Sequence, residues 1–212
     1  MGIDHNSLKQ INSDIIHFSS KTKLIIVTKN RSEIDVSELL SLGYQAFGEN
    51  RVQEAKLKFS ALRKNYSFKL HLLGPLQTNK TSLALSIFDT IQSIDRVKLV
   101  NEIKKLLDKE EIHCRTKNFF IQVNIGNEPQ KSGIKLEECK DFYFYCKDII
   151  NINGLMCIPP IDKNPQKYFE KMIDLRNQID SSLKLSMGMS ADYQEALKQK
   201  ADYIRVGSKL FL

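Results

Sequence analysis

One pattern repeats along the whole chain: a short apolar run is followed by a longer segment whose apolar residues recur every three or four positions. The short runs have the length and branched apolar content of buried strands, and the longer segments have the periodicity of helices that bury one face. Eight strands are therefore expected, spaced by roughly 20 to 30 residues. Their positions are 24–27, 44–47, 68–73, 90–94, 118–124, 154–158, 183–186 and 202–206.

The helical segments between these strands carry recognisable end signals. Gly43 is suited to the left-handed conformation that ends a helix over residues 32–42. Asp95 is placed to cap the helix that follows the fourth strand. An additional amphipathic helix is expected over residues 8–18, before the first strand.

Eight strands alternating with helices predict an α/β protein with a single (β/α)8 TIM barrel and an extra N-terminal helix. A doubly wound open sheet is the alternative, because it shows the same alternation. Such sheets usually have fewer strands and often carry an early GxGxxG or GxxxxGK[ST] loop, and this sequence contains neither motif. No linker rich in Gly, Pro or Ser divides the chain, so residues 1–212 are expected to form one domain.

The cysteines, histidines and apolar runs indicate which compartment, metal and membrane interactions to expect. The four cysteines include no CxxC pair, which favours a reducing cytoplasm. The four histidines show neither HxxxH nor HExxH spacing, so no metal is expected. No signal peptide and no apolar run of membrane-spanning length is apparent, so no membrane partner is expected either.

The net charge of +7 raises the question of nucleic acid. The lysines and arginines are spread along the chain and mixed with 25 acidic residues, without a basic arm or a patch that contains aromatic residues. Nucleic-acid binding therefore ranks below a site for a small phosphorylated ligand.

In a barrel of this type the ligand site is built at the carboxyl ends of the strands. Lys29 stands there, just after the buried strand at 24–27. A lysine at the rim of an apolar core is partly desolvated, which lowers its pKa and makes the neutral, nucleophilic form available for a Schiff base. The alternative is a lysine that extends into water. Taken alone, this segment favours the alternative.

Two glycine-containing turns after the last strands favour the interpretation of Lys29 as a ligand-binding lysine. Ser186-Met-Gly-Met-Ser190 follows the seventh strand and Arg205-Val-Gly-Ser208 follows the eighth. Glycine permits close backbone approach to an anion, and barrels frequently bind phosphate in this region. Ordinary tight turns are the alternative interpretation. A phosphate site with an imine-forming lysine describes pyridoxal phosphate (PLP), and it also describes a sugar-phosphate aldolase.

The sequence resembles the YggS-like family, also called pyridoxal phosphate homeostasis proteins. The matching stretches run in order along most of the chain: Val27-Thr-Lys29, Phe47-Gly-Glu-Asn-Arg-Val-Gln-Glu54, His71-Leu-Leu-Gly-Pro-Leu-Gln-Thr-Asn-Lys80, Ser93-Ile-Asp-Arg96, Gln122-Val-Asn124, Gly154-Leu-Met156, Leu185-Ser-Met-Gly-Met-Ser190 and Arg205-Val-Gly-Ser208.

The resemblance implies a barrel like the N-terminal domain of alanine racemase, with PLP bound to Lys29 as a Schiff base. It also implies roles for six further residues: Asn50 beside the cofactor ring, Ser186 and Met187 near the ligand, Arg205 facing the pyridine nitrogen, and Gly207 with Ser208 holding the phosphate. Relatives usually continue beyond the position of Leu212 with a further glycine and a terminal helix, a departure that bears on barrel closure and on cofactor affinity.

The same resemblance favours a carrier over an enzyme. A permanently charged arginine at the pyridine nitrogen disfavours its protonation and so weakens the ring as an electron sink. The β-domain and partner subunit that give alanine racemase its second acid/base have no expected counterpart here. A monomeric, cytoplasmic protein that delivers PLP to apo-enzymes and supports vitamin B6 and amino-acid homeostasis is therefore expected. The alternatives, in order, are a PLP-dependent racemase-like enzyme, a Schiff-base aldolase and a nucleic-acid-binding protein.

Overall fold

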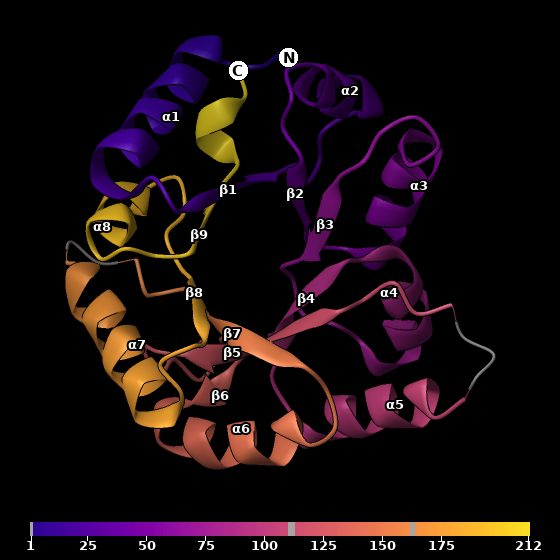
Figure 1. Ribbon diagram of the computed structural model, residues 1–212, viewed down its shortest axis with the longest axis vertical. Helices are drawn as coiled ribbons and strands as arrows, with labels where there is room; N and C mark the ends of the chain where they lie inside the picture. The colour runs from indigo at the N-terminus through magenta and orange to yellow at the C-terminus, as the bar shows by residue number, and fades with distance from the viewer. Residues whose placement is uncertain (1, 110–112, 162–163) are drawn as a thin grey trace.

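A computed structural model describes residues 2–109, 113–161 and 164–212 of the chain. Its strands are parallel and form a closed ring, seen end-on in Figure 1. The ring runs β4-β3-β2-β1-β9-β8-β7-β5, and pairing of β4 with β5 completes it. The predicted (β/α)8 barrel is confirmed. Its strands are β1 (Lys23–Val27), β2 (Ala46–Glu49), β3 (Lys69–Leu72), β4 (Thr90–Ile94), β5 (Asn118–Asn124), β7 (Ile152–Cys157), β8 (Lys184–Ser186) and β9 (Tyr203–Val206).

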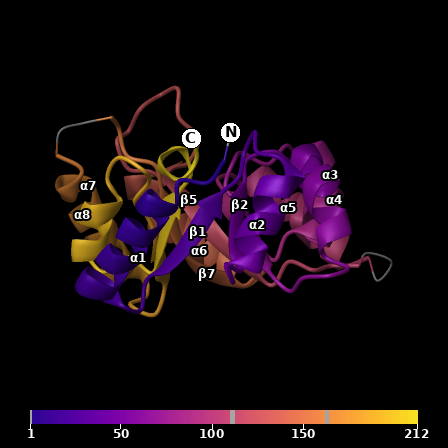
Figure 2. The ribbon, with the colours of Figure 1, turned by 90° about the horizontal axis from the view of Figure 1, so that it is seen from above.

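Helices surround this barrel, as Figure 1 and the perpendicular view in Figure 2 show. The predicted N-terminal helix is present as α1, and it packs against α8, where the Tyr193 hydroxyl donates to Asp14 at 2.7 Å. The α-helices of the described residues are α1 (His5–Ser19), α2 (Glu33–Ser41), α3 (Val52–Leu62), α4 (Thr81–Ile87), α5 (Val97–Leu107), α6 (Cys139–Lys147), α7 (Gln166–Ile179) and α8 (Tyr193–Lys198). None of them is both long and apolar enough to cross a bilayer.

Three short 3-10 helices and one extra strand were not predicted. They are η1 (Thr78–Lys80), η2 (Leu136–Glu138), η3 (Ser208–Leu210) and β6 (Ile134–Lys135), which pairs with β5 outside the ring. Segments of two or three residues are too short to show a hydrophobic period, so no pattern in the sequence marks them.

The two ends of the chain meet where the barrel closes between β1 and β9. Four residue pairs hold this junction, among them Ile25 with Arg205. Ile3 forms an antiparallel bridge with Phe211, and the N–H of Asp4 donates to the carbonyl of Leu210 at 2.9 Å. Both termini consequently lie together at one rim (Figure 1). The expectation that the departure at Leu212 bears on barrel closure is not met, because β1 and β9 close the ring themselves. Its bearing on cofactor affinity stays a prediction.

The helix-end predictions gave one confirmation and one error. Gly43 has φ of +89° and follows α2, as expected for a left-handed residue at a helix end. Asp95 does not cap α5: the N-cap residue is Arg96, without a side-chain cap bond, and the Asp95 carboxylate instead pairs with the Arg96 guanidinium. An arginine adjacent to the aspartate competes for the carboxylate that capping would have used.

The inside of the barrel is lined by residues that alternate with those facing the helices. The rings of His71 and Phe120 each lie within 6 Å of the Tyr203 ring, at centroid distances of 5.9 and 5.8 Å. These residues come from β3, β5 and β9, which are not neighbours in the ring, so all three side chains must point inward. The interior is therefore partly polar, unlike the apolar layer between barrel and helices.

Candidate functional site

Four neighbouring strands carry most of the predicted site residues to one end of the barrel. Asn50 follows β2, Lys29 follows β1, Gly207 and Ser208 follow β9, and Ser186 ends β8. The strand order β2-β1-β9-β8 makes these positions consecutive around the ring. Because all the strands are parallel, their carboxyl ends share one face, which is where barrels place their ligand sites. These predicted residues are therefore brought to one side of one mouth.

Lys29 lies in a tight turn just beyond β1. The N–H of Arg31 donates to the Thr28 carbonyl at 3.1 Å, so Lys29 and Asn30 are the central residues of a β-turn. Asn30 has φ of +59°, a conformation that asparagine tolerates better than most residues. The Lys29 side chain is exposed rather than partly desolvated, contrary to the expectation from the buried strand before it. The turn carries the amine past the edge of the apolar core, where solvent and ligands reach it.

Arg205 lies inside the barrel and is only 3% exposed. Its guanidinium donates to the Ser186 hydroxyl at 2.9 Å and to the Cys157 carbonyl at 2.7 Å. Within the described residues it forms no ion pair with a carboxylate, and burial lowers the pKa of Arg205 from its usual value. A buried cation without a carboxylate is costly, so it indicates a site that receives an electron-rich or anionic group.

The arginine is one end of a polar chain that crosses the barrel. The Ser186 hydroxyl donates to the Gln92 side-chain carbonyl at 2.6 Å, and the Gln92 amide lies 3.2 Å from Nδ1 of His71. β7 and β5 separate β8 from β4 in the ring, so this bond joins two strands that are not neighbours through the interior. Burial lowers the pKa of His71 to about 4, which leaves its ring neutral near pH 7. Ser186 is therefore fixed between a cation and an amide.

Gln92 and His71 were not singled out as site residues from the sequence. Their signal was weak: each is a polar residue in a segment that otherwise has the apolar character of a buried strand. Both are buried, with Gln92 at 0% and His71 at 5% exposed. Polar residues at alternate positions of a barrel strand point to the interior, and that periodicity is the only feature that could have identified them.

Beyond β9, two backbone N–H groups converge on the hydroxyl oxygen of Ser190, an arrangement that can hold an anion. The backbone N–H groups of Gly207 and Lys209 both donate to the Ser190 hydroxyl oxygen, at 3.3 and 3.4 Å. Two amides that converge on one oxygen at the start of η3 form the kind of backbone concavity that binds phosphate. Gly207 also approaches β1 closely, since an added Cβ would lie 3.0 Å from Val27. Both glycine-containing turns thus contribute to one location.

Met187 is not brought together with these residues. Its side chain is fully buried in the apolar layer between barrel and helices, and its N–H donates to the Tyr203 carbonyl at 3.1 Å. It follows Ser186, whose side chain points inward, so alternation along the strand turns Met187 the other way.

Asn50 adjoins a cavity of about 540 Å³ on the β2 to β4 side of the mouth. Most of the walls follow these strands, and their charged residues are Arg51, Lys80 and Arg96 with the acidic Asp95. Asn50 is half-buried, and its backbone lies so close to Gly74 that a Cβ there would meet the Asn50 carbonyl at 2.3 Å. Asn50 is the one predicted site residue among the described residues that line this cavity.

Comparisons with known proteins agree with the fold. The family model for the N-terminal domain of alanine racemase matches residues 3–212. The pyridoxal phosphate homeostasis protein of Aquifex aeolicus is 35% identical over 199 residues, covering 89% of this chain and 86% of that protein. The protein of the same name from Pasteurella multocida is 33% identical over 231 residues, covering 100% and 97%.

Solved structures give the same result in three dimensions. PipY of Synechococcus elongatus, without PLP, has a TM-score of 0.85 at 30% identity, with 98% of this chain and 99% of that chain covered. PipY with PLP bound has a TM-score of 0.82 at 29% identity and the same coverage. Alanine racemase of Corynebacterium glutamicum, at 14% identity, TM-score 0.69 and coverage of 98% and 61%, shows a shared fold alone. The chain belongs to the pyridoxal phosphate homeostasis protein family, whose barrel is the alanine racemase N-terminal domain.

Proposed function

We propose that the chain binds pyridoxal 5'-phosphate covalently through Lys29 and contributes to intracellular PLP, vitamin B6 and amino-acid homeostasis, as a carrier rather than an enzyme. The observation that carries the proposal is the consecutive placement of Lys29, Arg205 and the Gly207 turn on β1 and β9. The PLP-bound structure of a relative that matches 98% of this chain supports it.

The residues present fit this cofactor. PLP has an aldehyde, a phosphate and a pyridine ring; when bound, it supplies an aldehyde that condenses with a primary amine and releases one water molecule. The exposed amine of Lys29 meets the first requirement. The amides that converge on Ser190 meet the second, because a phosphate oxygen can accept the same donors. Arg205 offers a buried guanidinium for an electron-rich ring atom.

Each remaining residue would have a distinct role. Asn50 would lie beside the ring, since it follows the strand next to β1. Ser186 would hold Arg205 in place and contact the cofactor. Gly207 and Ser208 would hold the phosphate through backbone and hydroxyl groups. We propose that residues 1–212 act as one domain in these roles.

The proposal of a carrier rests on what the interior provides. A guanidinium that keeps its charge disfavours a proton on a neighbouring pyridine nitrogen, and the ring then accepts electrons poorly. Racemisation also needs an acid/base on each face of the ring. The His71 ring is bonded to Gln92 and buried, which makes it a poor second base. Binding without turnover is the function these features support.

One spectroscopic experiment tests the binding. Wild-type protein mixed with PLP should acquire a visible absorption band distinct from that of free PLP, and Lys29→Ala should not. Incubation of the loaded protein with single amino-acid enantiomers in deuterated water is the second arm. Sustained exchange of the α-proton with turnover would contradict the carrier role, and an unchanged spectrum in the wild type would contradict binding.

The same proposal includes a monomeric, cytoplasmic protein that delivers PLP to apo-enzymes, without nucleic acid or membrane as a partner. PLP-loaded protein mixed with a PLP-dependent apo-enzyme should restore that enzyme's activity faster than the same amount of free PLP does. Equal rates would show that delivery is by free diffusion.

A further inference from the structure

A buried cluster on the outer side of β1 and β2 holds the turn that carries Lys29. The cluster consists of Glu49, Glu54 and Lys58. Glu49 ends β2 and is 0% exposed, while Lys58 lies in α3 and is 7% exposed. The structure places neither carboxylate free in solvent.

Lys58 has no capacity left for a ligand. Its ammonium group donates to the Thr28 carbonyl at 2.6 Å, to Glu49 at 2.7 Å and to Glu54 at 3.1 Å. An ammonium has three N–H donors, so these three bonds satisfy it completely. Lys58 is therefore a tether between α3 and the end of β1, and it does not compete with Lys29 as a reactive amine.

The cluster grips the residues on both sides of Lys29. On one side, the Thr28 hydroxyl donates to Glu49 at 2.6 Å, in addition to the bond between the Thr28 carbonyl and Lys58. On the other side, the N–H of Asn30 donates to Glu54 at 2.7 Å. Three anchors thus fix the two neighbours of Lys29, while the Lys29 side chain itself stays exposed.

The charges of the cluster are not balanced. It holds two carboxylates against one ammonium, and Oε2 of Glu49 has no hydrogen-bond partner among the described residues. Burial raises the pKa of Glu49, against the opposing effects of Lys58 and Thr28. For Glu54 burial also acts upward, but the bonds from Asn30 and Lys58 outweigh it and lower its pKa. Buried charge of this kind is often less stable than apolar packing, so its presence calls for a role in geometry.

We propose that Glu49, Glu54 and Lys58 are positioning residues that fix the direction of the Lys29 amine from outside the barrel. The inference rests on the proposed function of Lys29 and adds the groups that control it. None of the three is proposed to touch the cofactor.

Glu54 gives the sharpest pair of variants, because it is only partly buried and its replacement leaves the Glu49 to Lys58 bond in place. Glu54→Ala removes the acceptor for the Asn30 N–H, whereas Glu54→Gln keeps a side-chain oxygen there. Lys58→Met removes the tether on Thr28. Hydrogen exchange of the peptide over residues 28–31, measured without cofactor, should accelerate about tenfold in Glu54→Ala and Lys58→Met, the effect of losing one hydrogen bond to a charged group. It should change less than about twofold in Glu54→Gln.

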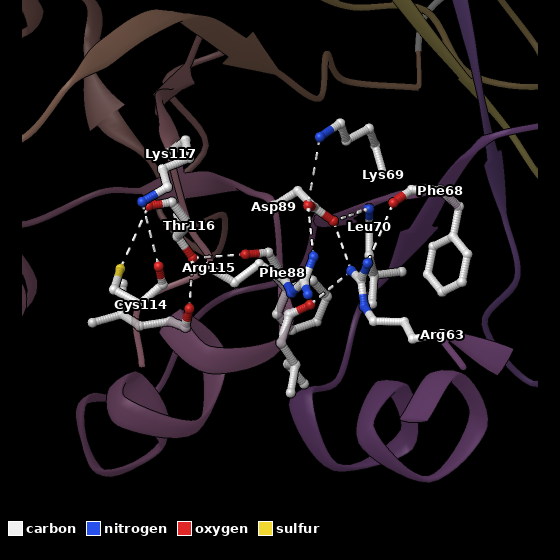
Figure 3. A network of polar contacts seen from close by, with 12 residues as sticks. Arg63, Phe68, Lys69, Leu70, Phe88, Asp89, Cys114, Arg115, Thr116 and Lys117 are labelled. Carbon is white, nitrogen blue, oxygen red and sulfur yellow. Dashed lines mark hydrogen bonds and ion pairs between the residues drawn. The ribbon is translucent and has the colours of Figure 1, made fainter. Parts of the chain in front are cut away.

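The same helix supplies a matched control at the other end of the barrel. Arg63, which follows α3, donates to Asp89 at 2.6 Å, and Asp89 directly precedes β4 (Figure 3). Asp89 is 6% exposed and also accepts from the Leu70 N–H at 2.9 Å. Asp89→Asn should lower the stability of the barrel by weakening a buried ion pair, and it should leave hydrogen exchange at residues 28–31 at the wild-type rate.

The second readout is the rate at which PLP is trapped on Lys29 by borohydride, followed by peptide mass. It should fall about tenfold in Glu54→Ala and Lys58→Met and remain at the wild-type rate in Asp89→Asn and Glu54→Gln. If Glu54→Ala and Lys58→Met match Asp89→Asn in both readouts, the positioning role is refuted. If wild-type protein traps no PLP on Lys29, the proposed function fails instead, and the exchange measurement still decides whether the cluster holds the turn.

Discussion

Replacing Ser186 with alanine should destabilise the protein far more than the loss of one small hydroxyl suggests. Ser186 is 0% exposed, and its hydroxyl donates to Gln92 at 2.6 Å and accepts from Arg205 at 2.9 Å. Alanine leaves a buried amide oxygen without its donor and a buried guanidinium without one acceptor. Each unsatisfied buried group costs about 1 to 3 kcal/mol, and the charged one lies at the upper end. The free energy of unfolding should therefore fall by about 3 to 5 kcal/mol.

Denaturant unfolding of cofactor-free protein measures this loss without any contribution from ligand binding. Ser41→Ala is the matched control, because its exposed hydroxyl donates to the Ser37 carbonyl at 2.9 Å and no buried group depends on it. The control should change the free energy of unfolding by less than about 0.5 kcal/mol. A loss below about 1 kcal/mol in Ser186→Ala would refute the idea that the buried Gln92 and Arg205 depend on the Ser186 hydroxyl for their hydrogen bonds.

Three further perturbations test other parts of the account. Gly188→Ala should lower the free energy of unfolding by about 2 to 4 kcal/mol, because φ is +90° there and the added Cβ would lie 2.4 Å from that of Ala196; a thermal melt at the wild-type temperature would contradict this. Asp89→Ala should cost about 3 kcal/mol by leaving Arg63 without its buried partner (Figure 3), measured by denaturant unfolding against Glu195→Ala, which removes a half-buried carboxylate from an ion pair with the exposed Lys198. The free energy of unfolding should decrease as the pH falls from about 6.5 to about 4, because the pKa of His71 is about 6.5 in the unfolded chain and about 4 in the folded protein. The decrease should amount to about 3 kcal/mol, and denaturant unfolding at the two pH values should show that His71→Gln abolishes it.

The barrel was predictable because its strands and helices each leave a strong periodic signal. The stretch before Lys29 is an example: residues 24–27 read as a fully buried strand, and β1 spans Lys23–Val27. β6 and the 3-10 helices have no such period. The cap at Asp95 failed for a related reason, since a propensity cannot report that Arg96 takes the same carboxylate.

The site was predictable only where sequence position fixes location. The ends of parallel strands must share a face, so Lys29, Asn50 and Gly207 were placed correctly at one mouth. Side-chain direction was not fixed in this way. Met187 was taken with Ser186, although adjacent residues point to opposite sides of a strand. Lys58 was missed altogether, because nothing in a helical stripe distinguishes a lysine that turns inward from one that faces water.

The central claim is that one lysine, at the end of β1, holds the cofactor. The most direct measurement is peptide mapping by mass spectrometry after wild-type protein loaded with PLP has been reduced with borohydride. The account predicts the mass increment of one reduced PLP on the peptide containing Lys29 and on no other peptide. An increment on any other lysine with Lys29 unmodified, or none at all, would contradict it.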